Sequence, residues 1–135
     1  MKKHLLMLAL ASTCFAATHA SAMTQDEYKA AKQQIEADYK SAKAQCDAMK
    51  DNAKDVCQKE AKGKEDVAKA ELEQQYKPSD AHARKVAEEK VKATYEVAKE
   101  KCDDQKGEAK DACVKQAKAD ESQGKADIKA MKKTM

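Results

Sequence analysis

The sequence predicts an all-α protein, folded as one long antiparallel helical hairpin that two disulfides hold together. Three observations lead to this prediction. The chain is rich in Ala, Lys, Glu and Gln, which are among the strongest helix formers. It contains an internal duplication, and four of its five cysteines lie at matching positions in the two copies. Aromatic residues make up only 4% of the chain. We therefore expect long, thin helices rather than a compact core.

The N-terminus has the pattern of a secretory signal peptide. Lys2 and Lys3 precede the apolar run "LLMLALASTCFAA", and small residues at 20–22 provide a cleavage site. The apolar run is shorter than the roughly 20 residues needed to span a bilayer. Lipoprotein processing at Cys14 is disfavoured because Thr13 is bulkier than such sites usually accept. We expect a signal peptide over 1–22 and a periplasmic mature chain, 23–135, forming one elongated helical domain.

Removal of the signal leaves an even set of cysteines, and an oxidising compartment favours their pairing as structural disulfides. They are Cys46, Cys57, Cys102 and Cys113. The mature chain has 25 basic residues against 24 acidic ones. This balance argues against a nucleic-acid-binding protein, which normally carries a strong basic excess.

The duplication pairs residues 28–75 with residues 84–131 at an offset of 56. It places "CDAMKDNAKDVC" on "CDDQKGEAKDAC". Within each copy, steps of 3, 4 and 4 residues from Tyr28 or Arg84 pass through all four cysteines and most apolar residues. Eleven residues in three turns is about 3.67 per turn, which is typical of nearly straight helical packing. We expect this stripe to form the core.

Helix boundaries follow from local signals. Thr24 and Glu27 form a capping box, and Pro78 disfavours helix at the residue before it. Ser79 or Asp80 can then cap a second helix. The predicted helices cover 24–76 and 80–132, each roughly 80 Å long.

Cysteines eleven residues apart on a continuous helix lie about 16 Å apart along its axis, too far for a disulfide. Folding at Pro78 instead brings Cys46 to Cys113 and Cys57 to Cys102, which is the preferred pairing. This register also sets Ile35 against Gly124.

Two tandem short helical hairpins are the alternative architecture. They would turn near 51–52 and 106–107, with local bridges Cys46–Cys57 and Cys102–Cys113. The two cysteine pairs resemble those of mitochondrial twin CX9C proteins, although ten residues separate the cysteines here rather than nine. The segment "KDNA" has neither Gly nor Pro, and this favours the long hairpin.

The residues do not indicate an enzyme, and we predict no catalytic, cofactor-binding or metal-binding residues. His82 is the single histidine of the mature chain, and a glycine-rich phosphate loop is absent from the sequence. The alternative function is a thiol-based copper or redox buffer of the envelope. In it, reduced cysteines with Met49, Met131 and Met135 would hold Cu(I), although no C-x-x-C spacing supports this.

The cadence of "AKAQCDAMKDNAKDVCQKEAK" looks like the hendecads of late embryogenesis abundant proteins. That resemblance implies a role in desiccation protection, but the cysteines depart from the pattern. We therefore expect an exported, non-enzymatic helical protein with a structural, stress-protective or partner-binding role. Its expected partners are another helical envelope protein or a second copy, without nucleic acid and without a stable membrane span after signal removal.

Overall fold

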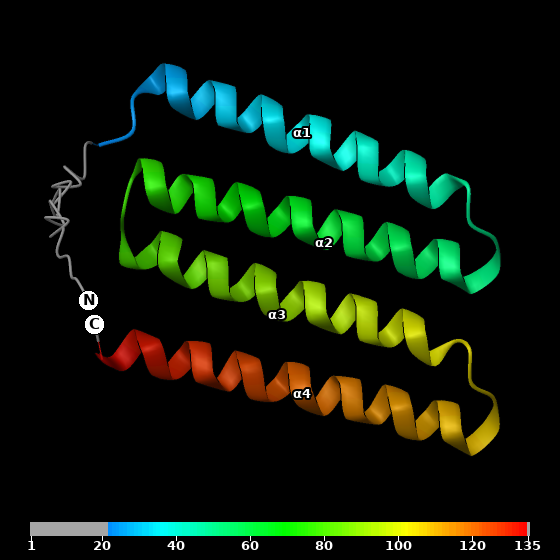
Figure 1. Ribbon diagram of the computed structural model, residues 1–135. Coiled ribbons are helices and arrows are strands. Elements are labelled where there is room, and N and C mark those ends of the chain that lie inside the picture. Colours follow the sequence, from blue (N-terminus) through cyan, green and yellow to red (C-terminus); the bar gives the residue numbers. More distant parts are fainter. Residues whose placement is uncertain (1–21, 135) are drawn as a thin grey trace, which may run out of the picture.

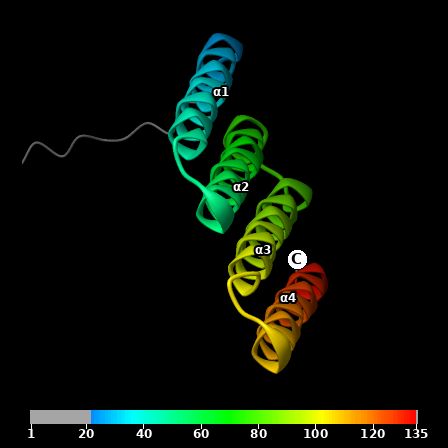
Figure 2. The ribbon, with the colours of Figure 1, turned by 90° about the vertical axis from the view of Figure 1, so that its right-hand side faces the viewer.

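The computed structural model describes residues 22–134 and contains four helices in a single layer. Each helix runs antiparallel to the one before it (Figure 1). They are α1 (Gln25–Asp47), α2 (Asp51–Tyr76), α3 (Asp80–Cys102) and α4 (Gly107–Thr134). The end-on view in Figure 2 shows the helices one after another in a row. Within the described residues, each helix packs only on its neighbours in sequence. The all-α prediction is confirmed, whereas Cys14, Met135 and all but Ala22 of the predicted signal peptide lie outside the described residues.

Two of the predicted helix boundaries are confirmed. The Glu27 backbone N–H donates to Thr24 Oγ1 at 3.2 Å, and the Thr24 N–H donates to Glu27 Oε2 at 2.7 Å, which completes the capping box. At the start of α3, the His82 N–H donates to Ser79 Oγ at 3.1 Å. The chain also folds back at Pro78, as predicted.

The predicted helices 24–76 and 80–132 are each interrupted once. The first breaks over 48–50, between α1 and α2, and the second over 103–106, between α3 and α4. The chain therefore adopts the alternative architecture of two tandem hairpins, α1–α2 and α3–α4. The fold-back at Pro78 then brings α2 beside α3 and joins the two hairpins.

The predicted eleven-residue stripe supplies most of the core. The buried apolar residues are Cys46, Ala61, Ala70, Leu72, Cys102, Ala117 and Ile128. All of them except Ala70 lie on the stripe. The stripe faces the partner helix within each hairpin, so Val91 packs on Gly124, where an added Cβ would lie 2.6 Å from Val91 Cγ2. The expected contact of Ile35 with Gly124 is therefore wrong, because the hairpin partner of α4 is α3 rather than α1.

Candidate functional site

The disulfides join Cys46 to Cys57 and Cys102 to Cys113, with Cα–Cα distances of 5.5 and 5.6 Å. The preferred pairing of Cys46 with Cys113 and Cys57 with Cys102 is therefore wrong. That pairing assumes a continuous helix from Cys46 to Cys57 and another from Cys102 to Cys113. The breaks after α1 and α3 remove that premise and bring each local pair within bonding distance. The structure thus brings together each repeat's own cysteines, at one end of the layer.

A residue with positive φ makes each hairpin turn. Asp51 has φ 52° and Gly107 has φ 57°, and each is the first residue of its helix. The two positions are equivalent under the 56-residue offset of the duplication. Glycine enters this left-handed region without a Cβ penalty, and Asp is one of the few other residues that tolerate it. The turn in "KDNA" thus needs neither Gly nor Pro.

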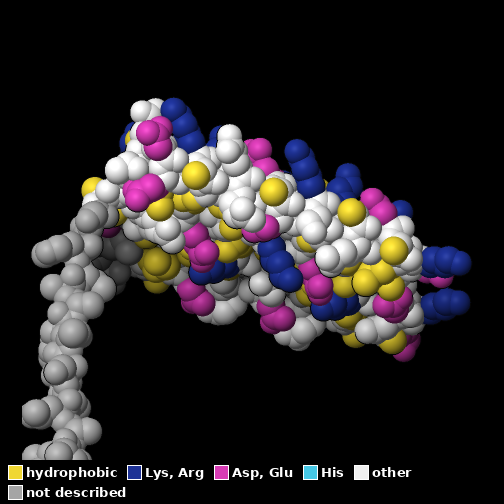
Figure 3. Space-filling model, turned by 45° about the horizontal axis from the view of Figure 1, so that its top comes forward, with side chains coloured by type: hydrophobic (Ala, Val, Ile, Leu, Met, Phe, Trp, Pro, Cys, Tyr) yellow, Lys and Arg dark blue, Asp and Glu magenta, His cyan; other side chains and the backbone are white. Residues whose placement is uncertain are grey.

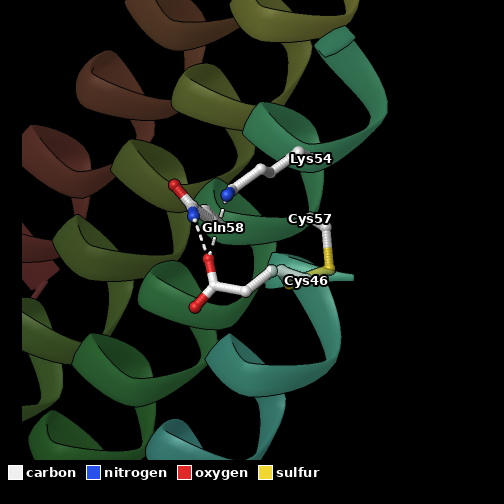
Figure 4. Close-up of a disulfide and its surroundings, with 5 residues drawn as sticks. Cys46, Lys54, Cys57 and Gln58 are labelled. Carbon is white, nitrogen blue, oxygen red and sulfur yellow. Dashed lines mark hydrogen bonds and ion pairs between the residues drawn. A yellow bond between two sulfur atoms is a disulfide. The ribbon is translucent and has the colours of Figure 1, made fainter. Parts of the chain in front are cut away.

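An ion pair accompanies each disulfide. The Lys54 ammonium lies 3.2 Å from the Asp47 carboxylate, and Gln58 Nε2 donates to the same carboxylate at 3.1 Å (Figure 4). The second hairpin repeats the ion pair between Lys110 and Asp103 at 2.8 Å, and this hydrogen bond raises the pKa of Lys110. The duplication has therefore kept a unit of disulfide, left-handed turn and Lys–Asp pair.

The four cysteines that the structure describes are engaged in disulfides and are not free thiolate ligands in this arrangement. All four sulfurs are used in disulfides, and the Cys46 and Cys102 side chains are 1% exposed. Met49 is 47% exposed, close to the first disulfide in sequence, whereas Met131 belongs to the far end of α4. Across residues 22–134, no group of three or more His, Cys, Asp or Glu side chains is placed to hold a metal ion.

A groove of about 1000 Å³ lies between α2 and α3. Its apolar floor includes Val67, Ala68, Val97 and Ala98. We call the side of the layer that carries this groove the groove face. Sequence reasoning missed it because the predicted long hairpin placed the eleven-residue stripe between the segments 24–76 and 80–132. In the structure the stripe lies inside each short hairpin, and Val67 and Val97, which lie beside the stripe, line the groove between α2 and α3.

Two ion pairs cross the groove. Glu60 binds Lys101 at 3.0 Å, and Glu71 binds Lys90 at 2.7 Å. In sequence, Val67 lies between the two glutamates and Val97 lies between the two lysines. In both pairs the acid comes from α2 and the base from α3. The apolar floor is therefore bordered on α3 by the bases Lys90 and Lys101, and on α2 by the acids Glu60 and Glu71 together with one base, Lys64.

Smaller grooves flank the central one inside each hairpin. In the first hairpin, Tyr39, Ala42 and Lys64 line a groove of about 280 Å³. Its repeat-equivalent in the second hairpin is lined by Tyr95 and Ala98, with a volume of about 210 Å³. Lys64 and Ala68 line both the central groove and the first of these, and Lys90, Thr94 and Ala98 line both the central groove and the second.

The opposite face of the α2–α3 pair is mostly charged. Its shallow hollow of about 260 Å³ is lined by Lys59, Lys62, Gly63, Asp66, Glu89, Lys92, Ala93 and Glu96. The ammonium groups of Lys59 and Lys62 donate hydrogen bonds to Glu96 and Asp66 respectively, and these bonds raise the pKa values of the two lysines. These side chains are paired with one another and leave less apolar surface than the groove face offers.

Glu65 is the one buried charged side chain among the described residues, at 8% exposure. Lys62 and Lys69 bind its carboxylate at 3.1 and 2.6 Å. Burial pushes the pKa of Glu65 upward, but the hydrogen bonds from Lys69 and Lys62 outweigh it and hold the pKa below its ordinary value. Glu65 therefore remains ionised at neutral pH, and its role is structural: it pairs with two lysines of α2.

No protein family, curated protein or solved structure matches this chain. In the part of the chain that the structure describes, none of the helices has the length and apolar character needed to cross a membrane.

Proposed function

We propose that this chain is an exported, non-enzymatic binding protein that receives an amphipathic helix of another envelope protein on its groove face. The observation that carries the proposal is the central groove between α2 and α3, with its apolar floor and its charged walls. The signal-like residues 1–22 and the two disulfides support export to the periplasm.

The shape of the groove suits a helix. A third helix laid along two antiparallel helices can place one apolar stripe between them, in the way that amphipathic helices bind hydrophobic grooves. The floor residues Val67, Ala68, Val97 and Ala98 are small or β-branched, and each is partly exposed. The single-layer arrangement leaves room for such a helix, because no other described helix covers this face.

The charged walls define the partner's chemistry. A helix in the groove would compete with the two ion pairs that cross it, by presenting basic side chains toward Glu60 and Glu71, and acidic side chains toward Lys90 and Lys101. Reversal of those two rows would oppose like charges, so the walls also favour one orientation. The expected partner segment has an apolar stripe flanked by a basic row on one side and an acidic row on the other.

Site-specific photocrosslinking in intact cells tests this function. A photoreactive residue at Val67 should capture one defined envelope protein, whose crosslinked peptide is an amphipathic helix with the stated charge rows. The matched control places the same residue at Lys92, which lies on the opposite face of the layer. The substitution Val97→Lys puts a charge in the floor and should abolish capture at Val67.

Equal capture from Val67 and Lys92, or capture that survives Val97→Lys, would contradict binding in the groove. Intact mass of the purified mature protein tests the rest of the proposal. We expect a chain beginning at Met23 that lacks four hydrogens and carries no metal. Free thiols with bound copper would support the metal-buffer alternative instead.

A further inference from the structure

The duplication makes the α2–α3 contact a template for joining one copy of the chain to another. Under the 56-residue offset, α1 is equivalent to α3 and α2 is equivalent to α4. The outer edge of α4 therefore corresponds to the edge of α2 that packs on α3. In the same way, the outer edge of α1 corresponds to the edge of α3 that packs on α2. If α4 packed on α1 of a second copy in this way, the contact would be head-to-tail and could repeat without limit.

The α2–α3 contact depends on a close approach and a charge pair. At Gly63, an added Cβ would lie only 2.8 Å from the Ala93 Cβ, so the helices approach at a position where α2 has no side chain. Beside it, Lys59 binds Glu96 at 3.0 Å. Both interactions are made by residues on facing edges of the two helices.

The outer edges lack both features. Ala119 stands at the position equivalent to Gly63, and it would meet Ala37 of the next copy, so two methyl groups would occupy the place of one. Lys115 is equivalent to Lys59 and would face Lys40, which replaces the acid of the inner pair. All four of these side chains are exposed in the structure.

The ion pairs that cross the groove are lost at the outer edges too. Gln116 and Gln45 stand at the positions equivalent to Glu60 and Lys101, so this pair has no charged equivalent at the outer edges. The pair Glu71–Lys90 becomes Asp127 with Gln34, which leaves an acid without its base. Gln123 and Ser41 stand at the positions equivalent to Val67 and Val97 of the groove floor.

We infer that the outer edges of α1 and α4 are stop surfaces, which limit the array to two hairpins and prevent head-to-tail assembly of the chain. Three independent changes at equivalent positions act in the same direction: a steric block, a repulsive lysine pair, and the loss of salt bridges and apolar contact. The inference does not depend on the proposed binding at the groove face, because the edges and that face use different residues.

Two half-restored variants test the stop surfaces, each returning one outer edge to the inner pattern. The α1 variant carries Gln34→Lys, Lys40→Glu, Ser41→Val and Gln45→Lys. The α4 variant carries Gln116→Glu, Ala119→Gly and Gln123→Val. Because the contact needs one edge of each kind, each variant alone should sediment as a monomer, and an equimolar mixture should form a one-to-one complex.

A chain that carries both sets of substitutions should form oligomers that grow with protein concentration. Analytical ultracentrifugation measures all four samples, and circular dichroism with non-reducing peptide mapping checks that each variant keeps its helices and disulfides. A second α4 variant that retains Ala119 avoids the helix-weakening glycine, and should bind the α1 variant more weakly than the full one.

Two results would overturn the inference. One is assembly of the unmodified chain through α4 and α1, detected by crosslinks between residues near 119 and residues near 37. The other is a mixture of folded half-restored variants that stays monomeric, which would show that the divergent positions do not control joining. Failure of the groove-face crosslinking experiment would affect neither readout.

Discussion

The two hairpins share a covalent frame but differ in their surfaces and in their open ends. Both have a disulfide, a left-handed turn residue and a Lys–Asp pair at the closed end. At the open end of the first, the rings of Tyr28 and Tyr76 stack with centroids 4.6 Å apart, and the Tyr28 hydroxyl donates to Glu73. The duplication places Arg84 and Lys132 at the positions equivalent to these tyrosines. The comparison indicates that the disulfide unit was retained while the remaining positions were free to diverge.

The largest expected effect comes from removing one disulfide at a time. In the chain-entropy model, a loop of this length is worth about 3 kcal/mol, a large part of the stability of so thin a core. We expect Cys102→Ser with Cys113→Ser to lose more helix than Cys46→Ser with Cys57→Ser, because the second hairpin lacks the tyrosine stack. Urea unfolding followed by circular dichroism measures both variants. Equal loss, or full helix content in the fully reduced wild-type chain, would contradict this account.

A smaller effect is expected at the contact that joins the hairpins. Gly63→Leu would drive a side chain into Ala93 and should destabilise the protein by about 1–3 kcal/mol through overpacking. The matched control is Ala119→Leu, at the equivalent but exposed position on α4, where a change within about 0.5 kcal/mol is expected. Thermal unfolding of the oxidised variants separates the two. A similar loss at both positions would show that the close approach at Gly63 is not what distinguishes them.

The smallest effects concern the turns, which use different residues for the same backbone conformation. Asp51→Gly should stabilise the first hairpin by about 1 kcal/mol, since a left-handed conformation is costly for residues with a Cβ. Gly107→Ala should destabilise the second hairpin by a similar amount. Urea unfolding of both oxidised variants gives the free energies. Changes of the same sign in the two turns would contradict their equivalence.

Much of the secondary structure could be predicted from the sequence, because the signals are local. Thr24 with Glu27 set the start of α1, and Pro78 set the turn between α2 and α3. The eleven-residue stripe also predicted most of the buried apolar residues. These features depend on capping hydrogen bonds, a missing backbone donor and helical periodicity, all of which are visible within a few residues.

The hairpin turns and the groove face could not be predicted in the same way. The turn at Asp51 depends on the tolerance of Asp for positive φ, and its clearest signal was its alignment with Gly107 in the duplication. Gly63 is where α3 approaches α2, and no local sequence signal marks that contact. The groove face depends on the same packing, because its floor and walls combine residues from both helices.

The positions of the disulfides also limit how far the chain can be stretched. Each bridge joins two cysteines eleven positions apart in sequence. The loop that it closes cannot extend under tension, and this shortens the fully extended chain by roughly 35 Å for each bridge. The beginning of α1 and the end of α4 lie at the end of the layer opposite the bridges (Figure 1). Tension on the two ends would therefore separate α1 from α2, and α3 from α4, until each covalent link is reached. Figure 3 shows apolar side chains interspersed with charged ones on the face in view. The two bridges therefore set a fixed limit on extension.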